Sequence, residues 1–171
     1  MIRAVLMYCV VMGVCALFMA AGVSANGDDG PENQFTVELF PAPEAYRMGG
    51  FPPGMTRQSF TAAHGSVVIT LLDKKRTKLE FDFSGLIPNG VYTMWNVLIL
   101  KPEFSDEPLG PTGYGKHGVI ADDTGNAHAV VYLEKRPGVM FLLDYHADGA
   151  LKGKKGVVNF PGALWGEFPE F

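Results

Sequence analysis

The fold is decided by the stretch Gly85–Leu100, which reads GLIPNGVYTMWNVLIL. Its first part, Pro88–Gly90, predicts a tight turn, because proline fixes φ and because asparagine and glycine tolerate positive φ. The second part, Val91–Leu100, is apolar at nearly every residue, as in a central strand that is covered on both faces. Tyr92 and Trp95 have opposite parity in this strand, so one is expected to face the core and the other the second face of the sheet.

Short strands are predicted on both sides of this stretch, at residues 34–40, 58–62, 66–72, 77–83, 117–121, 126–133, 139–146 and 156–160. The pattern is clearest in Lys78–Phe83, where charged and apolar residues alternate. Eight or nine such strands with turns between them predict an all-β, antiparallel β-sandwich, either Ig-like or jelly-roll-like. Two long loops rich in proline and glycine, residues 41–56 and 101–116, are expected to interrupt it. The aromatic tail, 161–171, is expected to pack over the core, with Gly166 and Pro169 preventing a strand there.

The N-terminal segment Met1–Ala25 is predicted to be a signal peptide. Arg3 is its only charge, an apolar run follows, and Val23-Ser24-Ala25 resembles a cleavage site. A retained membrane anchor is the alternative, because the apolar run approaches the roughly 20 residues that span a bilayer. We expect an exported protein, in the periplasm, at the cell surface or outside the cell. Residues 26–33 would then be a flexible lead-in to one domain, residues 34–171.

Composition excludes several classes of function. Both cysteines, Cys9 and Cys15, lie in the predicted leader, so the domain has no disulfide, thiolate metal site or haem attachment motif. The 14 basic residues less Arg3 leave 13 against 18 acidic residues, a net charge of −5, which argues against a nucleic-acid partner. There is no Asn-x-Ser/Thr sequence, which favours a bacterial origin. Gly-x-Ser-x-Gly, phosphate-loop and His-Glu-x-x-His motifs are absent, so no enzyme class is indicated.

One candidate site follows from strand register. If Leu133 and Val139 flank a hairpin as a pair, His128 lies opposite Asp144. A slip by two residues pairs His128 with His146 instead, and in either register these side chains share one face. The opposite face is then predicted to form part of the core, with Ile120, Ala127, Ala129, Val131, Leu133, Val139, Phe141 and Leu143.

His117 is expected to join the same face through the preceding hairpin. His117, His128, Asp144 and His146 would then supply three imidazoles and a carboxylate, which suit Zn²⁺ or Cu²⁺. They would alternatively serve as a protonation switch, or be surface side chains on a solvated face. An aromatic ligand platform is a further hypothesis, with Tyr132 and Met140 beside the histidines and with Tyr92 and Trp95 on the central strand.

A family resemblance rests on Leu86, Pro88, Asn89, Tyr92 and Trp95. Their spacing resembles a Leu-x-Pro-(Asn/Gly)-x-x-Tyr-x-x-Trp signature of small exported bacterial β-sandwich domains, among them the extracytoplasmic domain of the anti-sigma-K factor family. The later turn Asp123–Ala127 is similar to the Gly-x-Ala end of that family's Asp-x-x-Gly-x-Ala hairpin, through Gly125 and Ala127. The resemblance implies a fold and not an activity, and no anti-sigma role is expected.

Taken together, these features predict an exported binding or interaction module for an unknown ligand or protein partner. The alternatives are a histidine-ligated Zn or Cu protein of the periplasm, and a membrane-anchored accessory subunit whose leader is retained.

Overall fold

The computed structural model describes residues 33–43, 56–100, 103–109, 118–146, 149 and 162–171. Within these ranges the chain forms one short helix and nine strands. In chain order they are β1 (Gln34–Pro41), α2 (Arg57–Phe60), β2 (His64–Leu71), β3 (Thr77–Ser84), β4 (Val91–Leu100), β5 (Glu103–Pro108), β6 (Gly118–Ile120), β7 (Ala127–Leu133), β8 (Met140–Tyr145) and β9 (Gly162–Glu167).

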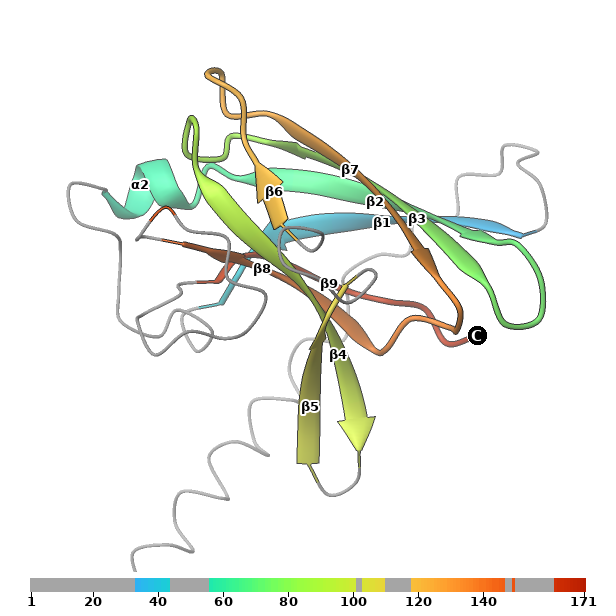
Figure 1. The fold of residues 1–171 in the computed structure, drawn as a ribbon. Coiled ribbons are helices and arrows are strands. Elements are labelled where there is room, and N and C mark those ends of the chain that lie inside the picture. The colour runs from blue at the N-terminus through green and yellow to red at the C-terminus, as the bar shows by residue number, and fades with distance from the viewer. Residues whose placement is uncertain (1–32, 44–55, 101–102, 110–117, 147–148, 150–161) are drawn as a thin grey trace, which may run out of the picture.

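All nine strands belong to one antiparallel sheet. The order is β5-β4-β8-β9-β1-β2-β3-β7, and β6 pairs with β4 on the same edge as β5. Figure 1 shows that this sheet curls into a half-barrel. The predicted all-β antiparallel class is therefore confirmed, whereas a sandwich of two separate sheets is not shown.

The half-barrel has two arms that meet at β1. We call β1, β2, β3 and β7 the first arm, and β9, β8, β4, β5 and β6 the second arm. Residues 34–39 of β1 pair with β2, whereas Phe40 and Pro41 pair with β9. Strand β9 approaches β1 closely at Gly166, where a Cβ atom would lie 2.5 Å from the side chain of Leu39. Glycine is needed here because two elements of the sheet come together.

The core lies between the two arms. In β3 the predicted alternation is confirmed, because Leu79, Phe81 and Phe83 are buried. Phe81 packs against Phe141 of the second arm, with ring centroids 4.7 Å apart. Burying a side chain of this size contributes roughly 1.5–3 kcal/mol, so packing across the arms is a main source of stability. Further buried members of this cluster are Leu39, Val67, Ile69, Met94, Val131, Leu133, Leu143 and Leu164.

Strand β4 is the predicted central strand. It lies between β8 on one edge and β5 and β6 on the other. Tyr92 faces the core, where its hydroxyl oxygen accepts a hydrogen bond from the Ile87 N–H at 2.8 Å and where burial raises the pKa of the phenol. Trp95 lies on the opposite face, in a second apolar cluster with Val97 and Leu142. The prediction that β4 is covered on both faces is confirmed.

The turn before β4 is docked onto the turn between β6 and β7. Asn89 has a φ of 56°, and the Gly90 N–H donates to the Ile87 carbonyl at 2.8 Å, which closes the predicted turn. Three backbone hydrogen bonds of 2.9–3.0 Å then join the two turns: Leu86 N–H to Gly125 C=O, Asn89 N–H to Asp122 C=O, and Ala121 N–H to Gly90 C=O.

Three predictions about the elements are wrong. Residues 57–60 form α2 rather than a strand, because Thr56 and Ser59 cap each other's backbone in a capping box. The loop predicted at 101–116 contains the edge strand β5, which tolerates its proline and its carboxylates because no described strand pairs with its outer edge. The tail contains β9, although Phe168 is buried as expected. The predicted leader, the strand at 156–160 and most of the loop at 41–56 lie outside the described residues.

The docked turns predict a large difference between two glycine substitutions. Gly125 and Gly149 have φ values of 82° and 66°, so alanine is strained at either position. At Gly125 a Cβ atom would also lie 2.4 Å from the Leu86 carbonyl oxygen, whereas at Gly149 no atom of the described residues would lie within 4 Å of it. We expect Gly149→Ala to lower the free energy of unfolding by about 1 kcal/mol and Gly125→Ala by about 3 kcal/mol. Urea unfolding measures both, and equal losses would show that the turn docking contributes nothing.

Candidate ligand-binding site

A row of polar side chains crosses the outer face of the first arm. Glu38 of β1 pairs with Ser66 of β2, Ser66 with Asp82 of β3, and Asp82 with His128 of β7. These residues point away from the core because their neighbours along each strand, such as Val67, are buried. His128 Nδ1 lies 2.8 Å from Asp82 Oδ1, and both side chains are exposed.

A second polar pair lies next to this row. His64 of β2 is paired in register with Ser84 of β3, and His64 Nε2 lies 2.8 Å from Ser84 Oγ. His64 Nδ1 lies 3.1 Å from the Ala62 carbonyl oxygen, which only accepts hydrogen bonds. The imidazole therefore carries its proton on Nδ1, and Nε2 accepts the hydrogen bond from the Ser84 hydroxyl. This arrangement fixes the orientation of the His64 ring.

Both polar groups line one open depression of about 530 Å³. Its walls come from four strands and from the turn between β6 and β7. The lining residues are Glu38, His64, Gly65, Ser66, Asp82, Phe83, Ser84, Asp122, Asn126, Ala127 and His128. They include three carboxylates and two imidazoles, and within the described part of the chain they include neither lysine nor arginine. The depression is therefore an acidic site with several hydrogen-bonding groups.

Asp122 is the best anchored of these carboxylates. Its Oδ1 accepts hydrogen bonds from the Asn126 N–H, the Thr124 N–H and the Thr124 hydroxyl, at 2.7–2.8 Å. These bonds, with the one from the Asn126 backbone first, hold the pKa of Asp122 below its ordinary value. Asp122 thus stays ionised and fixed at the rim of the depression.

The strand pairing expected for the metal site is wrong. Strand β7 pairs with β3, and β8 pairs with β4 and β9, so His128 and Asp144 lie on different arms. His117 lies outside the described residues. Among the residues that the structure describes, no three His, Cys, Asp or Glu side chains are grouped so that they could hold a metal ion.

Most of the predicted core face of these strands is confirmed. Of the eight residues predicted to form the core face, Val131, Leu133, Phe141 and Leu143 are buried and Ala127 and Ala129 pack against the core. The two others are exposed because Ile120 is the last residue of β6 and Val139 comes just before the first residue of β8.

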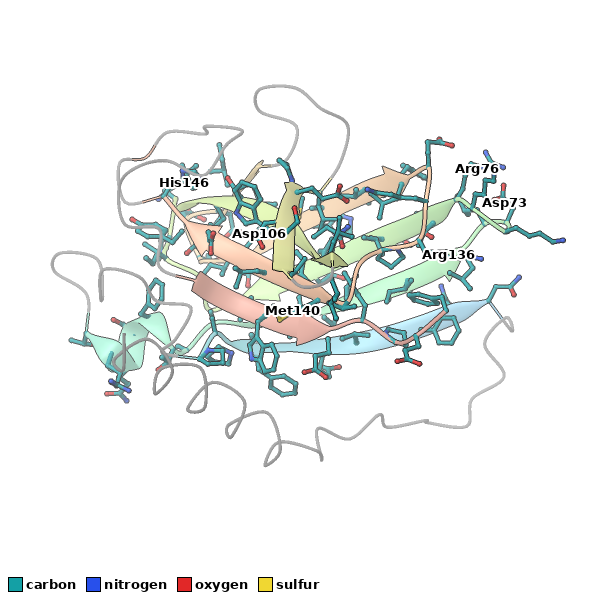
Figure 2. The ribbon with its side chains drawn as sticks, turned by 90° about the horizontal axis from the view of Figure 1, so that it is seen from below. Asp73, Arg76, Asp106, Arg136, Met140 and His146 are labelled. Atoms are coloured by element: carbon teal, nitrogen blue, oxygen red, sulfur yellow. The ribbon has the colours of Figure 1, made fainter. Side chains whose placement is uncertain are left out.

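Asp144 and His146 lie in a buried polar cluster on the outer face of the second arm. Asp144 pairs in register with Thr93 of β4, and the Thr93 hydroxyl is hydrogen-bonded to His146 Nε2. Burial raises the pKa of Asp144 to about 7, and a hydrogen bond from Trp95 opposes part of this rise. Figure 2 shows that His146 lies at the opposite end of the molecule from the turn that carries Asp73 and Arg76.

The residues predicted as an aromatic platform are dispersed. Tyr92 is 1% and Trp95 4% exposed, so neither presents a ring to a ligand. Met140 packs against the second apolar cluster. Tyr132, by contrast, is 60% exposed on β7, at the margin of the first arm.

Sequence reasoning missed most of the depression. Glu38, Ser66, Asp82, Ser84 and Asp122 were not candidates, although the alternation in β1 and β3 does predict that Glu38 and Asp82 point outward. The missing information was that β7 pairs with β3, since this pairing brings His128 to Asp82.

Comparison with known proteins adds no assignment. No protein-family model and no curated protein matches this sequence. The resemblance to the anti-sigma-K extracytoplasmic domain therefore stays a prediction. In the part of the chain that the structure describes, no helix is both long and apolar enough to cross a bilayer.

The buried carboxyl of Asp144 predicts how stability depends on pH. Its pKa in the folded chain, about 7, lies above the ordinary value of 3.8 for an aspartate carboxyl, so ionisation opposes folding. The contribution of Asp144 to the free energy of unfolding should therefore fall as pH rises from about 4 to about 7, by at most ~4 kcal/mol. Asp144→Asn keeps an acceptor for Trp95 but removes the charge, so its stability relative to wild type should rise over this range.

Urea unfolding at pH 4, 6 and 8 measures this difference. Asp123→Asn is the control, because Asp123 is exposed in the turn between β6 and β7. A stability difference between Asp144→Asn and wild type that stays constant with pH would contradict the buried, protonated carboxyl.

Proposed function

We propose that this chain is an exported binding module for a positively charged ligand, which docks in the acidic depression on the outer face of the first arm. The observation that supports this most is the composition of the depression. Three carboxylates, those of Glu38, Asp82 and Asp122, line one open hollow, and no lysine or arginine is among the described residues that line it.

The strand register supports a defined recognition geometry. Neighbouring strands lie about 4.8 Å apart, so Glu38 and Asp82, two strands apart, are separated by roughly 10 Å at their backbones. A cationic group of the size of an ammonium or guanidinium fits between two carboxylates at this spacing. Ser66 lies between them and offers a hydroxyl acceptor. Hydrogen bonds from an ionised donor to carboxylates are stronger than those between neutral groups.

The guanidinium group of an arginine side chain suits the site best. It presents five donors in a planar fork and pairs with carboxylates through two parallel hydrogen bonds. We therefore take an arginine-containing peptide as the ligand class. Because the depression is open to water, binding should be weak to moderate and should weaken as salt is added.

Export is part of this proposal and rests on the Met1–Ala25 segment alone. The metal-binding alternative is not proposed, because the strand pairing that motivated it does not form among the described residues. An accessory-subunit role requires that the leader is retained as a membrane anchor. N-terminal sequencing of the exported protein distinguishes the two, because a chain that starts at Asn26 has lost the leader and one that starts at Met1 has kept it.

Calorimetric titration with the blocked peptide acetyl-Gly-Arg-Gly-amide tests the proposal. We expect the double variant Glu38→Gln/Asp82→Asn to bind at least tenfold more weakly than wild type at low ionic strength, because each lost charge-assisted bond contributes about 1.5 kcal/mol. Glu80→Gln is the matched control, since Glu80 lies one row away, is paired with Lys78 at 2.8 Å, and does not line the depression. Equal binding of the peptide with glutamate in place of arginine, or no effect of the double variant, would refute the proposal.

A further inference from the structure

Strand β7 forms one edge of the sheet that the described residues make. It is the last strand in the sheet order, and Figure 1 shows it along the margin of the first arm. One edge of β7 pairs with β3 over seven consecutive residues, Ala127–Leu133. Among the described residues no strand pairs with its other edge. About half of its backbone N–H and C=O groups thus point away from β3, where they could form hydrogen bonds with a further strand.

The two edges of the sheet differ in composition. On the opposite edge, β6 is only three residues long, and β5 reads EFSDEP, with three carboxylates and a proline that hinder pairing with a further strand. Strand β7 reads AHAVVYL, with His128 as its only ionisable group apart from a tyrosine. Its pairing with β3 has no bulge. On its outer face Val130 is 43% and Tyr132 60% exposed.

We propose that β7 pairs antiparallel with β7 of a second copy of this chain, about a two-fold axis that passes beside Val130. The sequence of the strand is self-complementary in this register. Val130 lies opposite Val130, His128 opposite Tyr132, Ala129 opposite Val131, and Ala127 opposite Leu133.

On the outer face, this pairing covers apolar side chains that are now exposed. Val130 packs against its own copy, and Tyr132 packs beside His128 of the second copy. Cross-strand pairs of β-branched and aromatic residues stabilise sheets by roughly 0.2–1 kcal/mol each. On the inner face every residue of β7 is apolar, so the second strand extends that face without burying a charge.

The pairing brings no like charges directly opposite each other. His128 faces Tyr132 of the second copy, and His128 Nδ1 lies 2.8 Å from Asp82 Oδ1 of its own chain. Lys78, one strand farther from the seam, is paired with Glu80 of its own chain at 2.8 Å. A two-fold axis perpendicular to the sheet keeps both acidic depressions on the same face, so the dimer would present two sites side by side.

Light scattering after size-exclusion chromatography of the full chain, over a hundredfold range of concentration, tests the dimer. Wild type is expected to reach twice the monomer mass, and Val130→Lys to remain monomeric because two lysines would face each other at the axis. Val68→Lys is the matched control: Val68 lies in the same outer row, on the interior strand β2, and should leave the dimer intact. A monomeric wild type, a dimeric Val130→Lys, or loss of the dimer in Val68→Lys would each overturn the proposal.

A disulfide test checks the register. Facing residues of antiparallel strands have Cα atoms about 4.5–5.5 Å apart, within the range that a disulfide spans. In a chain with Cys9→Ala and Cys15→Ala, Val130→Cys should cross-link on mild oxidation, whereas Tyr132→Cys should not, because it faces residue 128. Efficient cross-linking of Tyr132→Cys, or none of Val130→Cys, would overturn this register. Because Val130 does not line the depression, Val130→Lys should still bind the arginine peptide, which separates failure of the dimer from failure of the proposed function.

Discussion

The rest of the structure depends on the docking of the turn before β4 onto the turn between β6 and β7. The chain passes from the first arm to the second between β3 and β4, and it returns between β6 and β7. Both crossings occur at the same end of the half-barrel, where three backbone hydrogen bonds join them. Backbone groups that would otherwise be left without partners as the chain leaves one arm are satisfied by the other turn. The docking therefore sets the separation of the arms, and with it the width of the core.

The same docking positions the acidic depression. Asp122 and Asn126 belong to one of the two turns, and Ser84 precedes the other. Gly85 and Gly125 both adopt positive φ, and at either position a Cβ atom would lie within about 2.5 Å of a carbonyl oxygen. The glycines thus allow close contact of backbones at the rim, so polar side chains converge there on a rigid frame. A site built in this way has little conformational entropy to lose when a ligand binds.

Local chemistry was predictable from the sequence, whereas long-range pairing was not. The Pro88–Gly90 turn, the buried strand β4 and the alternation in β3 follow from residues close together in the chain, and all three are confirmed. The pairing of Phe40 with Trp165 joins residues far apart in sequence, which no local pattern encodes. Likewise, the connection after Leu133 looks like a hairpin but leads from one arm to the other, which separates His128 from Asp144. The candidate site in the structure differs from the predicted one for this reason. His128 lies on the predicted outer face, but its neighbour is Asp82 rather than Asp144 or His146.

The two outer faces of the half-barrel have different physical roles. On the second arm, Trp95, Leu142 and Asp144 are buried, so a substitution there affects folding before it affects any ligand. On the first arm, the outer side chains of β3 and β7 contribute little to the core, and polar residues cost little there. Because the fold does not require three carboxylates around one depression, or an edge strand without a lysine, these two features need an explanation outside folding. The proposed ligand binding would explain the first feature, and the proposed pairing of β7 with a second copy would explain the second.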